Sequence, residues 1–74
     1  MTRLPNLTPK KLLRALKRAG FVEGEQKGSH LYLTNYATNK HTGIPMHGKD
    51  VKRSLMKEII RQAGMTEAEF TKFL

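Results

Sequence analysis

The chain has 74 residues, no cysteine and a formal net charge of +8, with 14 Lys and Arg against six Asp and Glu. This length fits a single domain over residues 1–74, whose hydrophobic core is close to the smallest size that folds without additional support. Because the chain has no cysteine, neither disulfides nor thiolate-bound metals can stabilise that core. The excess of positive charge predicts a polyanionic partner, nucleic acid first and an acidic protein surface second. No apolar run approaches the ~20 residues of a membrane span and no signal peptide is apparent, so we expect a cytoplasmic protein.

The first predicted helix follows an irregular lead-in over residues 1–7. Thr8 supplies a capping hydroxyl and Pro9 suits the first helical position, so the helix should begin there, run to about Ala19 and stop at Gly20. Its apolar side chains share one face at three- and four-residue spacing: Leu12, Leu13, Leu16 and Ala19. The five Lys and Arg of this helix have no acid among them. They therefore repel one another unless an anion lies nearby.

Two strands are predicted on either side of a glycine turn. A weak strand runs from Phe21 to the turn at Gly28, and a firmer strand covers residues 30–35. Strand side chains alternate between the two faces of a sheet. If the two leucines of the firmer strand point inward, the opposite face carries His30, Tyr32 and Thr34.

A third strand and a second helix follow. After a polar turn over residues 37–40, residues 41–46 fit a strand that Pro45 confines to a sheet edge or a strand end. The second helix should begin within a residue or two of Asp50 and end at Gly64. Its predicted apolar face consists of Val51, Leu55, Met56, Ile59, Ile60 and Ala63. A basic stripe with a four-residue repeat begins just before it: Lys49, Arg53, Lys57 and Arg61.

A short third helix closes the chain. Thr66 and Glu69 form a capping box, with Met65 and Phe70 placed as a hydrophobic staple. The order α-β-β-β-α, with a short C-terminal α, predicts an α+β sandwich of two layers: a three-stranded antiparallel sheet with the helices on one face. Double-stranded-RNA-binding domains have the same order of elements, but fold alone does not give function.

One histidine stands at the junction of the glycine turn and the firmer strand, in the segment Lys27-Gly28-Ser29-His30. Histidine changes charge near neutral pH and is the usual proton-transfer residue, and glycine lets the backbone turn sharply or approach a ligand. In a strongly positive field, an accessible imidazole indicates phosphate chemistry on a polyanion. The alternative is a turn that starts a strand and carries a surface histidine.

Four segments of the chain fit one family pattern. They are Ala19-Gly20-Phe21, Gln26-Lys27-Gly28-Ser29-His30, Ile44-Pro45-Met46-His47-Gly48-Lys49-Asp50 and Ile60-Arg61-Gln62-Ala63-Gly64-Met65-Thr66. Together they resemble the HicA toxin family of bacterial and phage toxin–antitoxin modules. Gly-Ser-His followed by Pro-x-His-Gly-Lys, at this length and charge, is far more specific than Gly-Ser-His alone.

The resemblance implies a small ribonuclease of the double-stranded-RNA-binding-domain fold. Such a toxin cleaves messenger RNA when it is freed from a HicB-like antitoxin, and the essential histidine of the family falls on His30. We expect the antitoxin to cover His30 and to neutralise part of the basic surface.

RNA cleavage without a metal requires a deprotonated 2′-hydroxyl, a protonated leaving 5′-oxygen and stabilised charge on the phosphate. Our hypothesis makes His30 the general base or acid and Lys27 a phosphate ligand. His47 is a second proton carrier, a phosphate contact at the entrance of the second helix, or only a turn residue. The other candidates for RNA or phosphate binding are Gly28, Ser29, Lys49 and Arg53. We expect no cofactor and no metal, because the three histidines lack ligand spacing and carboxylate support.

Two other functions compete with the ribonuclease. A non-catalytic RNA-binding module would use the basic stripes and the glycine loop to hold phosphates. A protein-binding domain would dock its basic face on an acidic partner. Tyr32 and Tyr36 each fit either a base-stacking role or half-buried packing.

Overall fold

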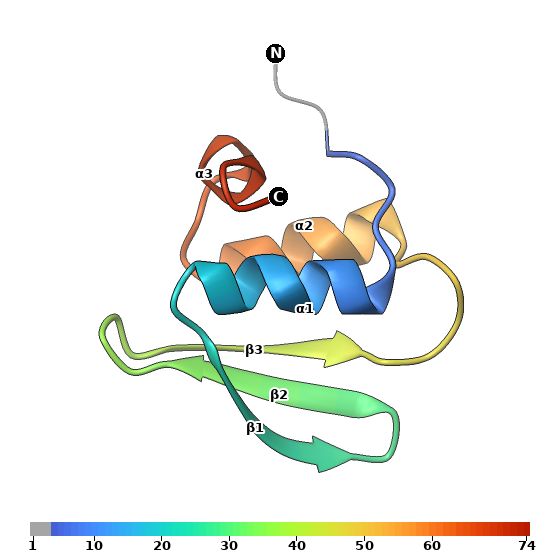
Figure 1. Cartoon of the computed structure of the whole chain (residues 1–74), viewed down its shortest axis with the longest axis horizontal. Helices are drawn as coiled ribbons and strands as arrows, with labels where there is room; N and C mark the ends of the chain where they lie inside the picture. The colour runs from blue at the N-terminus through green and yellow to red at the C-terminus, as the bar shows by residue number, and fades with distance from the viewer. Residues whose placement is uncertain (1–3) are drawn as a thin grey trace.

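A three-stranded antiparallel sheet and two helices packed on one of its faces form the two layers of the protein (Figure 1). The computed structural model describes residues 4–74, so the first three residues of the predicted lead-in lie outside it. The elements are α1 (Pro9–Arg18), β1 (Val22–Lys27), β2 (His30–Asn35), β3 (Lys40–Pro45), α2 (Arg53–Gln62) and α3 (Glu67–Thr71). The strand order is β1-β2-β3, so β3 is an edge strand as its proline requires. The predicted α+β fold is confirmed.

Helix α1 begins and ends where the sequence predicts. The hydroxyl of Thr8 accepts a hydrogen bond from the backbone N–H of Lys11 at 3.3 Å, and Pro9 follows at the first helical position. Ala19 caps the C-terminal end and Gly20 takes the chain out of the helix. The buried residues are Pro9, Leu12, Ala15 and Leu16, while Leu13 and Ala19 are only partly buried. The opposite side of the helix is left to Lys and Arg.

The lead-in contributes to the core although it is irregular. Leu4 and Leu7 are 1% and 5% exposed, nearly as deeply buried as Leu12 and Leu16 of α1. The backbone N–H of Val51 donates to the carbonyl of Leu7 at 2.9 Å, which ties the lead-in to the segment before α2. Isolated leucines in a stretch without periodicity carry no sequence signal of burial, so this part of the core was not predicted.

Helix α2 begins later than the sequence predicts. It starts at Arg53, and Asp50 lies in the loop ahead of it. Residues 51–52 do not turn into the helix because Val51 bonds to the lead-in and its side chain is buried there. The expected apolar face is also corrected at Leu55, whose side chain is 39% exposed. The predicted end is confirmed, with the last helical residue two positions before Gly64.

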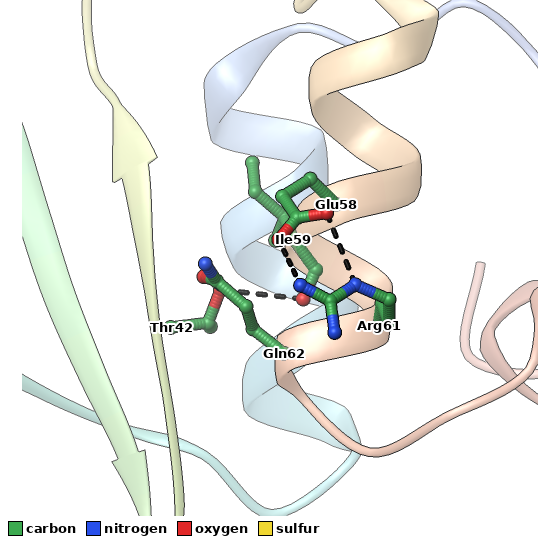
Figure 2. A network of polar contacts seen from close by, with 5 residues as sticks. All are labelled: Thr42, Glu58, Ile59, Arg61 and Gln62. Carbon is green, nitrogen blue, oxygen red and sulfur yellow. Dashed lines mark hydrogen bonds and ion pairs between the residues drawn. The ribbon is translucent and has the colours of Figure 1, made fainter.

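A buried hydroxyl joins β3 to α2. The side chain of Thr42 points to the helices, and its Oγ1 lies 3.3 Å from the carbonyl oxygen of Ile59 and 3.3 Å from Oε1 of Gln62 (Figure 2). On the same helix, Arg61 donates to the carboxylate of Glu58 and thereby lowers the pKa of that carboxyl. The contacts of Thr42 fix the C-terminal half of α2 against the edge strand, whereas the Arg61–Glu58 pair lies within the helix.

The predicted capping box of α3 is present. The backbone N–H of Thr66 donates to the carboxylate of Glu69 at 2.9 Å, and the hydroxyl of Thr66 accepts from the N–H of Glu69 at 3.1 Å. The helix places Phe70 in the core, 0% exposed. Within residues 4–74, no helix has the length and apolar character needed to cross a membrane.

The capping box predicts a component of acid sensitivity. The backbone hydrogen bond from Thr66 lowers the pKa of Glu69 in the folded state. A depressed folded pKa stabilises the fold above the unfolded pKa, about 4.3, and this stabilisation is lost as the pH falls through the folded value. Urea titrations between neutral pH and pH 3 should therefore show a smaller acid loss of unfolding free energy in Glu69→Gln than in the wild type. Parallel profiles for the two proteins would contradict the role given to this carboxylate.

Candidate functional site

The Lys27-Gly28-Ser29-His30 segment forms the hairpin between β1 and β2. Lys27 is paired directly with His30, and Gly28 and Ser29 make the two-residue connection. Gly28 has φ +58°, and a side chain there would meet nothing within 4 Å, so the backbone conformation rather than space favours glycine. Glycine in the first of the two turn positions suits a type II′ hairpin. All four residues are exposed.

The hairpin places Lys27 and His30 on the same face of the sheet. Directly opposed residues of antiparallel strands point the same way, with Cβ atoms about 5 Å apart. Leu31, the next residue along β2, is buried under the helices, so His30 must lie on the face that the helices leave open. An imidazole and an ammonium group are therefore neighbours on solvent-exposed sheet.

The two halves of the sequence motif meet at one end of the sheet. His30 pairs with Pro45, and the backbone N–H of Met46 donates to the carbonyl oxygen of Ser29 at 2.6 Å. His47 follows Met46 directly, so the backbone of the second histidine leaves β3 beside the hairpin turn. Figure 1 shows this turn, the loop after β3 and the beginning of α1 at the same end of the molecule.

The loop between β3 and α2 holds two further predicted residues. His47 and Lys49 are both exposed in it, ahead of the first residue of α2. Because the helix starts at Arg53, His47 lies farther from the helix entrance than the sequence suggests. Helical N–H groups are thus less available to a phosphate at this histidine than was expected.

Arg53 has a structural contact that the sequence did not reveal. Its guanidinium donates to the carbonyl oxygen of Leu4 at 2.8 Å and so holds the lead-in against the start of α2. A guanidinium has five N–H donors, so a phosphate can still bind the remaining ones. The long sequence separation between Arg53 and Leu4 explains why no local pattern predicted the contact.

The basic side of α1 extends this region. Lys10, Arg14, Lys17 and Arg18 surround a shallow cavity of about 600 Å³, whose apolar floor is Leu13 and Met46. Two of these cations have partners: Lys17 lies 2.8 Å from the carboxylate of Glu23, and Arg18 donates to the carbonyl of Phe73 at 3.1 Å. The Lys17 pair is exposed and contributes little stability, about 0–1 kcal/mol. The cations of α1 thus share a cavity with Met46, whose backbone bonds to Ser29 of the hairpin.

The third histidine of the chain lies farther along the open face. Nδ1 of His41 and Oγ1 of Thr34 are 3.0 Å apart on adjacent strands, and His41 is exposed. Within residues 4–74, no group of three or more His, Asp and Glu side chains is arranged to hold a metal ion.

Comparison with known proteins adds one finding. Residues 9–65 match the model of a family described as "HicA toxin of bacterial toxin-antitoxin". The matched segment runs from the first residue of α1 to the residue before the cap of α3, and so contains the hairpin and the loop after β3. No curated protein matches the chain.

Proposed function

The chain belongs to the HicA toxin family of toxin–antitoxin systems, and from this premise we propose that it is a metal-independent endoribonuclease that cleaves messenger RNA. The observation that carries the proposal is the direct pairing of Lys27 with His30 at a glycine turn on the open face of the sheet. This pair offers a proton-transfer group beside a positive charge, which are two of the three functions that the reaction needs.

In the proposed reaction, the 2′-oxygen of one nucleotide attacks the phosphorus that joins it to the next. The imidazole of His30 removes the 2′-hydroxyl proton, the bond between phosphorus and the 5′-oxygen breaks, and that oxygen takes up a proton. The products are a 2′,3′-cyclic phosphate and a free 5′-hydroxyl. The ammonium of Lys27 stabilises the negative charge that builds up on the phosphate oxygens.

His47 is the proposed second proton carrier. Its backbone adjoins the hairpin through the Met46–Ser29 hydrogen bond, so it is the histidine of the loop that a phosphate at Lys27 can approach. Arg53 and Lys49 supply further positive charge for the strand on either side of the scissile phosphate. Gly28 and Ser29 let the phosphate come close to the backbone of the turn.

A toxin of this family has an antitoxin partner, and we propose a HicB-like protein that covers His30. His30 is exposed beside Lys27 in a chain of net charge +8, so the charge of an acidic antitoxin surface is complementary to this region. Adding the antitoxin to a cleavage reaction should stop it. Continued cleavage by a complex that leaves His30 open to solvent would overturn this part of the proposal.

The reaction predicts a strict requirement for one hydroxyl group. Two oligonucleotides of the same sequence, one of them 2′-deoxy only at the cleaved nucleotide, should be compared in EDTA with the purified protein. We expect cleavage of that bond to be lost in the deoxy substrate, and a cyclic phosphate on the product of the other, because the 2′-oxygen is the nucleophile. Cleavage of both substrates at that bond would exclude this mechanism, and retained binding without any cleavage would favour the RNA-binding module.

A further inference from the structure

The face of the sheet opposite the helices is uncovered, and it carries more than His30. The register of β2 with β3 pairs Tyr32 with Gly43 and Thr34 with His41, so these side chains share the face with His30. Figure 1 shows both α1 and α2 on the other side. Tyr32 is 46% exposed although it lies in the middle strand.

Tyr32 lies between glycines on both neighbouring strands. A Cβ atom on Gly43 would be 3.2 Å from Cδ1 and Cε1 of Tyr32, so the ring rests on the backbone of β3. On the other side, a bulge sets Gly24 and Glu25 against Tyr32, and a Cβ on Gly24 would be 3.2 Å from the Tyr32 carbonyl oxygen. The Tyr32 ring therefore packs on the backbone of Gly43 and remains exposed to solvent on its other side.

A hydrogen-bonding side chain, His41, lies near the open ring. The ring lines a shallow cavity of about 500 Å³ that also includes His41 and extends round the edge strand to Gln62. His41 engages Thr34 through Nδ1, which leaves Nε2 for a ligand. Gln62, on α2, accepts a hydrogen bond from Thr42 through Oε1 on the helix side of β3 (Figure 2). None of the residues that line the cavity is a carboxylic acid.

We propose that Tyr32 is a stacking platform for one base of the RNA substrate, next to the phosphate held at His30, and that His41 contacts the edge of that base. This proposal rests on the proposed function and adds a base-binding site to it. Tyr32 is two residues from His30 on the same face, or about 6.6 Å along the strand, so one nucleotide can reach both. The site accepts a flat, uncharged heterocycle, and the +8 protein attracts its phosphates.

The chain allows a direct observation of stacking. It has two tyrosines and no tryptophan, and the other tyrosine, Tyr36, is 80% exposed in the turn between β2 and β3 at the opposite end of the sheet (Figure 1). In the double variant His30→Ala, Tyr36→Phe, Tyr32 is the only tyrosine and the RNA stays intact. A short single-stranded oligoribonucleotide should quench the fluorescence of Tyr32. A fully abasic oligonucleotide of the same length should not quench it.

Binding measurements in the His30→Ala background complete the test. Tyr32→Leu, which keeps an apolar group over Gly43, should weaken oligoribonucleotide binding about 5- to 150-fold, the equivalent of ~1–3 kcal/mol per stacked base. Tyr32→Phe should retain affinity within about twofold, and the matched control Tyr36→Leu should bind as its parent does. An oligonucleotide lacking the one stacked base should bind Tyr32→Leu and its parent equally, which separates stacking from altered folding.

The outcomes distinguish this proposal from the proposed function. Absence of quenching overturns base stacking even where the wild type cleaves RNA. The same holds if Tyr32→Leu weakens binding of the abasic oligonucleotide as much as it weakens binding of the complete one. A Tyr32→Leu variant that binds RNA normally but has lost affinity for the antitoxin also overturns it, since the face then serves the protein partner. Quenching with the predicted affinity loss supports it whether or not the wild type cleaves.

Discussion

His30→Ala is expected to slow the cleavage of single-stranded RNA by about 10²- to 10⁴-fold, the usual contribution of a positioned general acid or base. Alanine removes the only group at this position that can take a proton from the 2′-hydroxyl, while Lys27 remains on the neighbouring strand to hold the phosphate. RNA affinity should therefore change far less than the cleavage rate. The measurement is a single-turnover time course in EDTA, with affinity determined separately on a 2′-deoxy analogue.

The fold should tolerate this substitution, because His30 is exposed and the helices pack on the opposite face. Lys72→Ala, an exposed change in the C-terminal turn, is purified in parallel and should cleave as the wild type does. Equal rates for all three proteins would remove His30 from the mechanism and point to a contaminating nuclease. A folded His30→Ala protein that is inactive but binds the analogue would establish its chemical role.

Phe70→Ala is expected to cost about 3–5 kcal/mol of unfolding free energy, as removal of a buried phenyl ring usually does. Phe70 is 0% exposed and belongs to α3, beyond the segment that matches the family model. A domain of this size has a total stability of about 4–11 kcal/mol. The variant should therefore lose a large share of its stability, and its melting temperature should fall by roughly 12 °C or more.

Thermal and urea unfolding followed by circular dichroism measure this effect. Leu74→Ala is the matched control, because Leu74 is 44% exposed in the same C-terminal segment and should change stability only slightly. A decrease of only 2–3 °C for Phe70→Ala would mean that α3 can detach from an otherwise stable domain. The expected result instead makes α3 part of the cooperative core of the domain.

The helices and strands were predictable because their signals are local. Thr8-Pro9 starts α1 and the Thr66 capping box starts α3 through bonds that span three residues. The alternation in β2 allowed a prediction conditional on inward leucines, which the burial of Leu31 and Leu33 confirms, and the glycine turn at Gly28 indicated the hairpin. The family could also be recognised from the sequence, because the Gly-Ser-His segment and the Pro-x-His-Gly-Lys segment are each contiguous in the chain.

The tertiary structure alone decided how these segments meet. The start of α2 depends on the bond from Val51 to Leu7, and the place of Arg53 depends on a carbonyl 49 residues away. The Met46–Ser29 bond brings the two halves of the motif together, and cross-strand register sets Tyr32 on Gly43. Such contacts follow from register and from the path of loops, which no short stretch of sequence specifies. Sequence therefore determined the elements and the candidate site residues of this protein, whereas packing determined which of those residues share a surface.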